Sequence, residues 1–456
     1  MSGLAILSLA ISLAVTPLSA TAGQKNWSVD LGRYNLNAGH ENASRNHKPT
    51  ILVAATNGAV AVAWGTLAHP AEPGVPDNWW SKPWEVNLLL FDANNGKLKA
   101  KSGPWTSDFS FELYPTAKGN FLLFLRHFHD AKQNPGETLY LLSSSGKELK
   151  KLDLLPSIRG SKPSWNEFLV SSSGGTVLLG QILEDGVHYR LLESDTLETK
   201  LEWTREAGSD SPGIVALSDK ELLGFHNVKN QEKPGLAGSE RDVYVRSFDG
   251  PWRPLHATLD VSSHGGLGQG LHPTQLAFLS DSVIVGVNAK RKELEGSILV
   301  LQSDGTVLSP PVIPKLPDRT NLTGPVAVST GGRYFAVGFQ HQPWMSHLLV
   351  DVMTMDITFW NDDSLFLIWE ASNPEPVARI PMGTDVRALS LAPDDPPTLA
   401  FVNGSSLKVV HFQVKTSARA MHTNSGIFRA CRRDRPPFAL GIGPVDRCAL
   451  PPLGFL

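Results

Sequence analysis

The chain has 456 residues, and its 41 basic and 44 acidic residues leave a formal net charge of −3. Proteins that bind nucleic acid usually carry a basic domain or stripe, so this balance argues against nucleic acid as a partner. The 40 glycines and 33 prolines exceed average usage, which favours short strands joined by turns over long helices. The length exceeds that of one ordinary compact domain, so we expect either several domains or one closed array of repeats.

The N-terminal segment 1–22 has the pattern of a cleavable signal peptide, although no Lys or Arg precedes its apolar run. That run extends from Leu4 to Val15, and Ala20-Thr21-Ala22 predicts cleavage before Gly23. The run is too short to span a bilayer comfortably. We therefore expect a secreted or periplasmic, monomeric protein that is not membrane-spanning after cleavage.

The segment 51–414 repeats one pattern of apolar run, turn, apolar run and longer connection. In the first unit, Asn57-Gly58 and Asn95-Gly96 each separate two apolar runs. Such dipeptides predict hairpins with type I′ turns, which need positive φ at both central residues. The units span 51–104, 108–155, 166–204, 213–258, 272–312, 324–382 and 385–414.

The spacing of these units predicts an all-β, seven-bladed β-propeller of four-stranded antiparallel blades, spanning 23–417. A period of about 50 residues with four strands per unit is typical of propellers. The widest unit carries an insertion over 341–363. The seventh unit has only three clear runs, so we expect a strand over 26–32 to complete it and close the ring without an open edge. The tail after 417 is the alternative source of that strand.

Glycine recurs near the end of the second run in five units. We expect these positions to be crowded near the propeller axis, where a residue without Cβ fits best. They are Gly65, Gly180, Gly224, Gly286 and Gly338.

In units six and seven, the order and spacing of apolar runs and turns are similar to those of the WD-repeat family. The relevant runs are Val386-Arg-Ala-Leu-Ser-Leu-Ala-Pro-Asp-Asp, Leu399-Ala-Phe-Val and Leu407-Lys-Val-Val, and Leu367-Ile-Trp-Glu stands where that family ends on Trp-Asp. The chain thus resembles a WD-repeat-like bacterial secreted β-propeller, without the Gly-His start or a true Trp-Asp pair. The resemblance implies a propeller and, by analogy alone, a binding role.

Histidines gather on the connections predicted to meet at one end of the propeller. Imidazole is a common metal ligand and proton shuttle, so these side chains could form a site for a ligand or a divalent metal. Here the chain resembles propeller lyases and copper reductases with a His-rich face. Alternatively, long polar connections simply hold most polar residues. Asp130 and Glu184 are possible carboxylate partners. The candidate histidines are His69, His127, His129, His226, His264, His272 and His341.

A tryptophan cluster lies on or beside the connection in the first unit. Trp79, Trp80 and Trp84 could stack on a sugar or a cation. An apolar lid that packs on the propeller is the favoured alternative. The glycine-rich run 262–272 lacks the Lys-Ser/Thr of a phosphate-binding loop, so we expect it to be a flexible loop.

The only two cysteines, Cys431 and Cys448, lie in the C-terminal tail, 418–456. In an exported protein they could form a disulfide that closes a short local loop.

Function is predicted only as a ranked set of hypotheses. Motifs of the best-known propeller enzymes are not found, and no cofactor is evident. The leading hypothesis is a secreted or periplasmic binding scaffold for a protein or glycan ligand, with its site at the end of the long connections. The rival is a lyase, hydrolase or metal-dependent enzyme that uses the histidines, and the third is a glycan-binding module that uses the tryptophans.

Overall fold

The computed structural model describes most of the repeated region of the chain. The chain divides into two units, Met1–Val414 and Lys415–Leu456, and all described residues belong to the first. The predicted signal peptide, the tail and its two cysteines lie outside them. The described residues are 25–34, 51–67, 84–107, 110–126, 137–155, 157–159, 162–164, 166–206, 211–227, 240–260, 274–288, 297–308, 311–316, 320–341, 365–381, 386–392 and 397–412.

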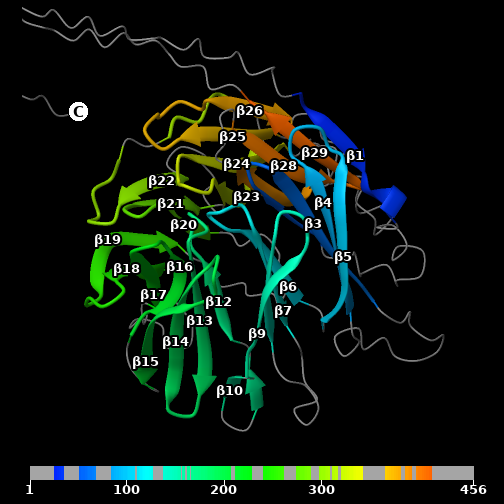
Figure 1. Ribbon diagram of the computed structural model, residues 1–456. Helices are drawn as coiled ribbons and strands as arrows, with labels where there is room; N and C mark the ends of the chain where they lie inside the picture. Colours follow the sequence, from blue (N-terminus) through cyan, green and yellow to red (C-terminus); the bar gives the residue numbers. More distant parts are fainter. Residues whose placement is uncertain are drawn as a thin grey trace, which may run out of the picture. The chain divides into compact units, whose positions relative to one another are not determined.

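Seven antiparallel sheets follow one another along the chain and form a seven-bladed β-propeller, which confirms the predicted fold class (Figure 1). Blades 1 to 3 are β2 (Ile51–Ala55), β3 (Ala59–Leu67), β4 (Trp84–Asp92) and β5 (Leu98–Ser107); β6 (Ser110–Pro115), β7 (Phe121–Arg126), β8 (Thr138–Leu142) and β9 (Glu148–Asp153); β12 (Glu167–Val170), β13 (Thr176–Leu183), β14 (Gly186–Glu193) and β15 (Thr199–Glu206).

The later blades continue the same order. Blades 4 to 6 are β16 (Gly213–Leu217), β17 (Glu221–Asn227), β18 (Glu240–Ser247) and β19 (Arg253–Asp260); β20 (Thr274–Ser280), β21 (Val283–Asn288) and β22 (Ile298–Gln302); β23 (Thr320–Val328), β24 (Tyr334–His341), β25 (Leu365–Glu370) and β26 (Ala378–Pro381). Blade 7 is β27 (Val386–Ala392), β28 (Thr398–Asn403), β29 (Ser406–His411) and β1 (Trp27–Asp30).

The N-terminal strand closes the ring as predicted, because β1 pairs with β29 from Trp27↔Val409 to Asp30↔Ser406. In Figure 1 the blue β1 lies beside the orange β29. The Trp27 indole donates to the carbonyl of Ala93 in blade 1 at 2.7 Å. The short 3₁₀ helix η1 (Leu31–Tyr34) follows.

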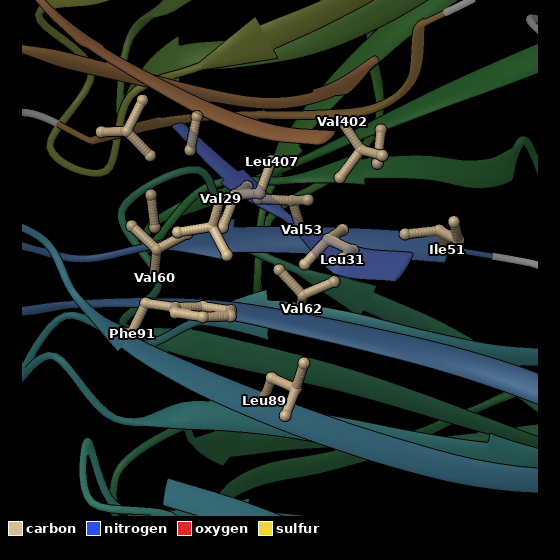
Figure 2. Packing of buried hydrophobic residues seen from close by; sticks show 14 of the residues in the cluster. Val29, Leu31, Ile51, Val53, Val60, Val62, Leu89, Phe91, Val402 and Leu407 are labelled. Carbon is tan, nitrogen blue, oxygen red and sulfur yellow. The ribbon is translucent and has the colours of Figure 1, made fainter. Parts of the chain in front are cut away.

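The closing joint between blades 7 and 1 is apolar. Val29 and Leu31 pack against Val53, Val62 and Leu407 in one buried cluster (Figure 2). Burial of such aliphatic side chains contributes about 1.5–3 kcal/mol each. The joint is therefore stabilised mainly by the hydrophobic effect and by the β1–β29 ladder.

The position of each strand within its blade explains its composition. Second and third strands such as β7 (Phe121–Arg126) are almost continuously buried, because both faces pack against neighbouring blades. Outer strands such as β15 (Thr199–Glu206) alternate between exposed and half-buried residues, since one face is solvated. The first strands lie innermost and line a central cavity of about 300 Å³.

Crowding at three of the repeated glycines, Gly65, Gly180 and Gly224, comes mainly from aromatic rings of the blades themselves. The innermost strands are the first of each blade, whereas the glycines lie on the second, so the expected crowding at the axis is wrong. A Cβ on Gly65 would lie 2.7 Å from the Phe111 ring, and one on Gly180 would lie 2.7 Å from the Tyr189 ring. Glycine at these positions makes room for an aromatic neighbour.

Blade 5 differs from the expected four strands. Its described part has three strands and a single further bridge, Leu301↔Val307. Pro310, Pro311 and Pro314 follow this bridge in sequence, and a proline has no N–H to continue a ladder. The chain turns instead toward blade 6, where the Val312 amide donates to the Pro374 carbonyl.

The two Asn-Gly hairpins of blade 1 are present, but the predicted turn type is wrong. Neither Asn57 nor Gly58 has positive φ, and in the second turn only Gly96 does, at 69°. The second turn is a longer loop in which the Asp92 amide donates to the Lys97 carbonyl. A single left-handed residue is sufficient there.

A small additional hairpin, β10 (Ser157–Arg159) with β11 (Lys162–Ser164), lies between blades 2 and 3. It was not predicted, because its strands are short and not apolar. No helix in the described ranges is both long enough and apolar enough to cross a membrane.

Candidate functional site: the long-connection end

The two ends of the propeller differ in the length of the segments that join the strands. First and second strands are joined by short turns, over 56–58, 116–120, 171–175, 218–220, 281–282, 329–333 and 393–397. Second and third strands are joined over 68–83, 127–137, 184–185, 228–239, 289–297, 342–364 and 404–405. We call the end where this second set leaves the strands the long-connection end, and the opposite one the turn end.

The structure describes only parts of the predicted histidine set. His226 is the second-last residue of β17, opposite Asp242, and His341 ends β24 opposite Thr320, so both backbones reach the long-connection end as expected. Their side chains lie outside the described residues. Glu184 lies in the tight β13–β14 turn and is exposed. The other candidates, together with Asp130, are outside the described ranges: His69, His127, His129, His264 and His272.

Trp84 has a different role from the predicted one. It begins β4, is only 5% exposed, and packs close to Gly65. A buried ring cannot stack on a ligand from solvent, so the prediction of a stacking role for Trp84 is wrong. Trp79 and Trp80 lie outside the described residues.

A network of charged side chains lies between blades 2 and 3 at the long-connection end. Arg126 Nη2 lies 2.7 Å from Glu112 Oε1, and Arg126 Nη1 lies 3.2 Å from Glu137 Oε1. The same Nη1 donates to the Asn166 carbonyl at 3.0 Å. The arginine therefore joins the strand ends of two blades at the base of the connection 127–137. We call these four residues the Arg126 network.

The sequence positions Arg126 by strand alternation. Side chains two residues apart share a face of a strand, so Arg126 lies on the face of β7 that carries Phe124. Phe124 stacks on Phe168 of blade 3, with ring centroids 4.2 Å apart, and the Arg126 guanidinium lies 4.9 Å from the Phe124 centroid. The apolar contact between the blades continues directly into the charged one.

Burial perturbs the acid–base properties of the network. Desolvation raises the pKa of Glu137 to about 7, against the lowering effect of the Arg126 charge and a hydrogen bond from the Asn166 amide. Only 4% of the Glu137 side chain is exposed. Burial also raises the pKa of Tyr114, whose hydroxyl donates to Glu112 at 2.8 Å. The raised pKa places the titration of Glu137 near neutral pH.

An outward-facing cleft of about 530 Å³ opens beside the network. Asp153 and Leu155 of blade 2 line it together with Gln181, His188 and Thr204 of blade 3. His188 pairs with Asp185 at 2.8 Å, and this hydrogen bond lowers the pKa of the Asp185 carboxyl. Leu155 is 72% exposed, so the rim of the cleft offers both apolar and polar contacts.

These residues were not among the sequence candidates. Arg126 and Glu137 flank the connection that holds His127 and His129, and a charged residue in the inward alternation of an apolar strand is the signal that could have found Arg126. Within the described ranges, no three His, Cys, Asp or Glu side chains gather as a metal site would require. The described geometry offers a cleft with polar and apolar lining beside a buried, charged network.

Comparison with known proteins adds little beyond the fold. No family model matches the chain, and no curated protein matches it. The Kuenenia stuttgartiensis hydrazine synthase structure is 12% identical, with a TM-score of 0.42, over 82% of this chain and 99% of that one. The propeller domain of the Trilobed protease from Pyrococcus furiosus is 9% identical, with a TM-score of 0.43, over 82% and 98%.

A β-propeller domain from Myceliophteria thermophila is 11% identical, with a TM-score of 0.36, over 80% of this chain and all of that one. Likeness at this level carries no statement about activity or ligand. The resemblance to the WD-repeat family therefore stays a prediction from the sequence.

Proposed function

We propose that this protein is a secreted or periplasmic binding scaffold that holds a protein or glycan ligand at its long-connection end. The proposal rests on the difference in connection length between the two ends. At one end the strands are joined by short turns, and at the other end they are joined by longer segments, among them 68–83, 127–137, 228–239 and 342–364. Binding residues concentrate on loops that a rigid scaffold positions. The WD-repeat cadence of the last two units agrees with a scaffold role.

The Arg126 network supports this placement because it fixes the base of one long connection. Arg126 and Glu137 are the residues on either side of 127–136, and Asn166 ties them to blade 3. Charge-assisted hydrogen bonds of this kind restrict strand ends more strongly than neutral ones. The adjacent cleft, with the exposed Leu155 and the His188–Asp185 pair, offers a mixed surface of the kind that protein ligands use.

Site-directed photo-crosslinking tests the proposal. Thr204→Cys places a label in the cleft, and Lys118→Cys places the same label on the turn end; both residues are exposed. The two labelled proteins are irradiated in the extracellular or periplasmic fraction of the producing cells. We expect a discrete adduct from the Thr204 position alone. Equal labelling from both positions, or none from either, would contradict the assignment of the site.

Two further measurements separate this proposal from its rivals. Stoichiometric metal in the purified protein, lost in a His127→Ala/His226→Ala variant, would favour an enzyme over a pure scaffold. Binding on a glycan array that disappears with Trp79→Ala and Trp80→Ala would identify the ligand as a sugar held by aromatic stacking.

A further inference from the structure

A second surface, on the outer strands of blades 3 and 4, contains an arginine held by aromatic rings. The Arg246 guanidinium lies 5.3 Å from the Trp203 centroid and 5.1 Å from the Trp252 centroid. Trp203 belongs to the outer strand of blade 3, and Trp252 directly precedes the outer strand of blade 4. The Trp203 ring in turn stacks on Tyr189, with centroids 5.1 Å apart. We call Tyr189, Trp203, Arg246 and Trp252 the arginine ladder.

The charge of Arg246 is not neutralised within the described residues. Arg246 has no carboxylate in salt-bridge range and no hydrogen-bond acceptor there, and its Nε is buried without a partner. Desolvation lowers the pKa of the guanidinium. A partly buried, unpaired cation is costly, and aromatic contact compensates for only part of the lost hydration.

Arg333 in blade 6 shows the usual arrangement in the same fold. Its guanidinium also lies over a ring, 5.0 Å from the Tyr334 centroid. There, however, Arg333 Nε donates to Glu370 Oε1 at 3.0 Å. Among the described residues, the stacked arginine of blade 6 has an internal carboxylate partner and the stacked arginine of blade 4 has none.

We propose that the arginine ladder is a binding site for an oxyanion, a carboxylate or a phosphate group of an external ligand. A guanidinium presents five N–H donors in a planar fork that matches two oxygens of such a group. Stacking holds that fork in a fixed plane, so little side-chain entropy is lost when the anion binds. Trp, Tyr and Arg are also the residue types that carry most of the binding energy in protein interfaces.

The geometry places this site away from the long-connection end. Arg246 is the second-last residue of β18, and Trp252 lies in the turn that follows, so the ladder lies toward the turn end. Tyr189 and Trp203 of the ladder also line the cleft between blades 2 and 3, whereas Arg246 and Trp252 do not, so the Arg246 variants change no residue of that cleft. A negative result for one site leaves the other proposal standing.

Isothermal titration calorimetry on the full chain at low ionic strength tests the site. The probes are acetate, inorganic phosphate, and one short peptide prepared with a free C-terminal carboxylate and with a C-terminal amide. We expect binding of at least one oxyanion, weakened about tenfold or more in Arg246→Met, because a bidentate charged contact is lost. The matched control Arg333→Met removes a stacked arginine elsewhere and should bind as the wild type does.

The relative affinities identify the source of the anion. Preference for the free peptide over its amide indicates a protein carboxylate, and preference for phosphate indicates a phosphate ester. If circular dichroism shows that Arg246→Met does not fold, Arg246→Lys serves as the second variant. It keeps the charge but loses the planar fork, so it should still weaken binding. Absence of binding by every probe, or equal binding by wild type and both Arg246 variants, would overturn the proposal.

Discussion

Neighbouring blades are joined by different chemistry at the two ends of the propeller. At the turn end, the Ser171 hydroxyl accepts from the Thr176 amide and donates to Asp219 of blade 4. Thr116 donates in the same way to Asp195 of blade 3. At the long-connection end, the joint is instead the Arg126 network, in which two carboxylates share one guanidinium.

One hydrogen-bond arrangement recurs at the turn end of five blades. The residue after the first strand is a buried Ser or Thr whose hydroxyl accepts from a backbone amide at the start of the second strand or, in blade 2, from the residue just before it. The residues are Thr56, Thr116, Ser171, Ser218 and Ser329. Neutral hydroxyls satisfy these turns within the fold. Uncharged hydroxyls thus stabilise the turn end, whereas the charged network makes the opposite end sensitive to pH.

Removal of Arg126 should have the largest effect. Arg126→Met leaves Glu112 and the buried Glu137 without their cation, and breaking one side of a buried ion pair costs about 3–5 kcal/mol. Urea unfolding at neutral pH measures the loss. The loss should shrink at acid pH, where the Glu137 carboxyl is protonated and no longer needs a cation. Arg333→Met removes an exposed pair with Glu370 and should cost about 0–1 kcal/mol; equal losses in the two variants would contradict the comparison.

The pH dependence of stability should be traceable to Glu137. Because its folded pKa is raised from 4.5 to about 7, the native state binds the extra proton, and stability present at low pH is lost as the pH rises through this window. The loss is about 3 kcal/mol at 1.4 kcal/mol per pKa unit. Thermal unfolding of wild type and Glu137→Gln across that range measures it. A slope that persists unchanged in Glu137→Gln would assign the titration to another group.

Substitution of a repeated glycine should have an intermediate effect that tests the aromatic packing. Gly180→Ala places a methyl group 2.7 Å from the Tyr189 ring, and overpacking of this kind costs about 1–3 kcal/mol. Gly213→Ala is the matched control, since nothing lies within 4 Å of its Cβ position. If a urea titration gives Gly180→Ala the same free energy of unfolding as the control, the close contact with Tyr189 does not affect stability.

The smallest effect is expected at the turn end. Ser171→Ala removes one hydroxyl from the amides of Gly175 and Thr176 and from Asp219. The expected loss is about 0.5–1.5 kcal/mol, the net contribution of a typical intramolecular hydrogen bond, because the Gly175 amide keeps the Ser173 hydroxyl as an acceptor. Ser145→Ala, in an exposed turn of blade 2, should change the urea midpoint less. Unlike Arg126→Met, the Ser171 variant should show no added pH dependence. A loss as large as that of Arg126→Met would remove the distinction between the two ends.

Much of the propeller could be predicted from the residues alone, because period and turn spacing are local properties. The apolar runs around Val60, Leu123 and Phe401 determine buried strands, and the orphan run at Trp27 predicted the closing strand. The turn type at Gly58 and the course of the chain after Val307 could not be predicted. Each depends on hydrogen bonds that form only once neighbouring strands are in place.

The candidate site depended almost entirely on tertiary structure. The sequence by itself determined that Arg126 follows an apolar run and that Trp84 adjoins a tryptophan-rich segment. Only the packing of blade 2 against blade 3 brought Arg126 to Glu137 and Asn166, and only the fold buried Trp84 beside Gly65. Periodicity sets which face of a strand a residue occupies, whereas burial, charge pairing and pKa depend on what the next blade places opposite that face.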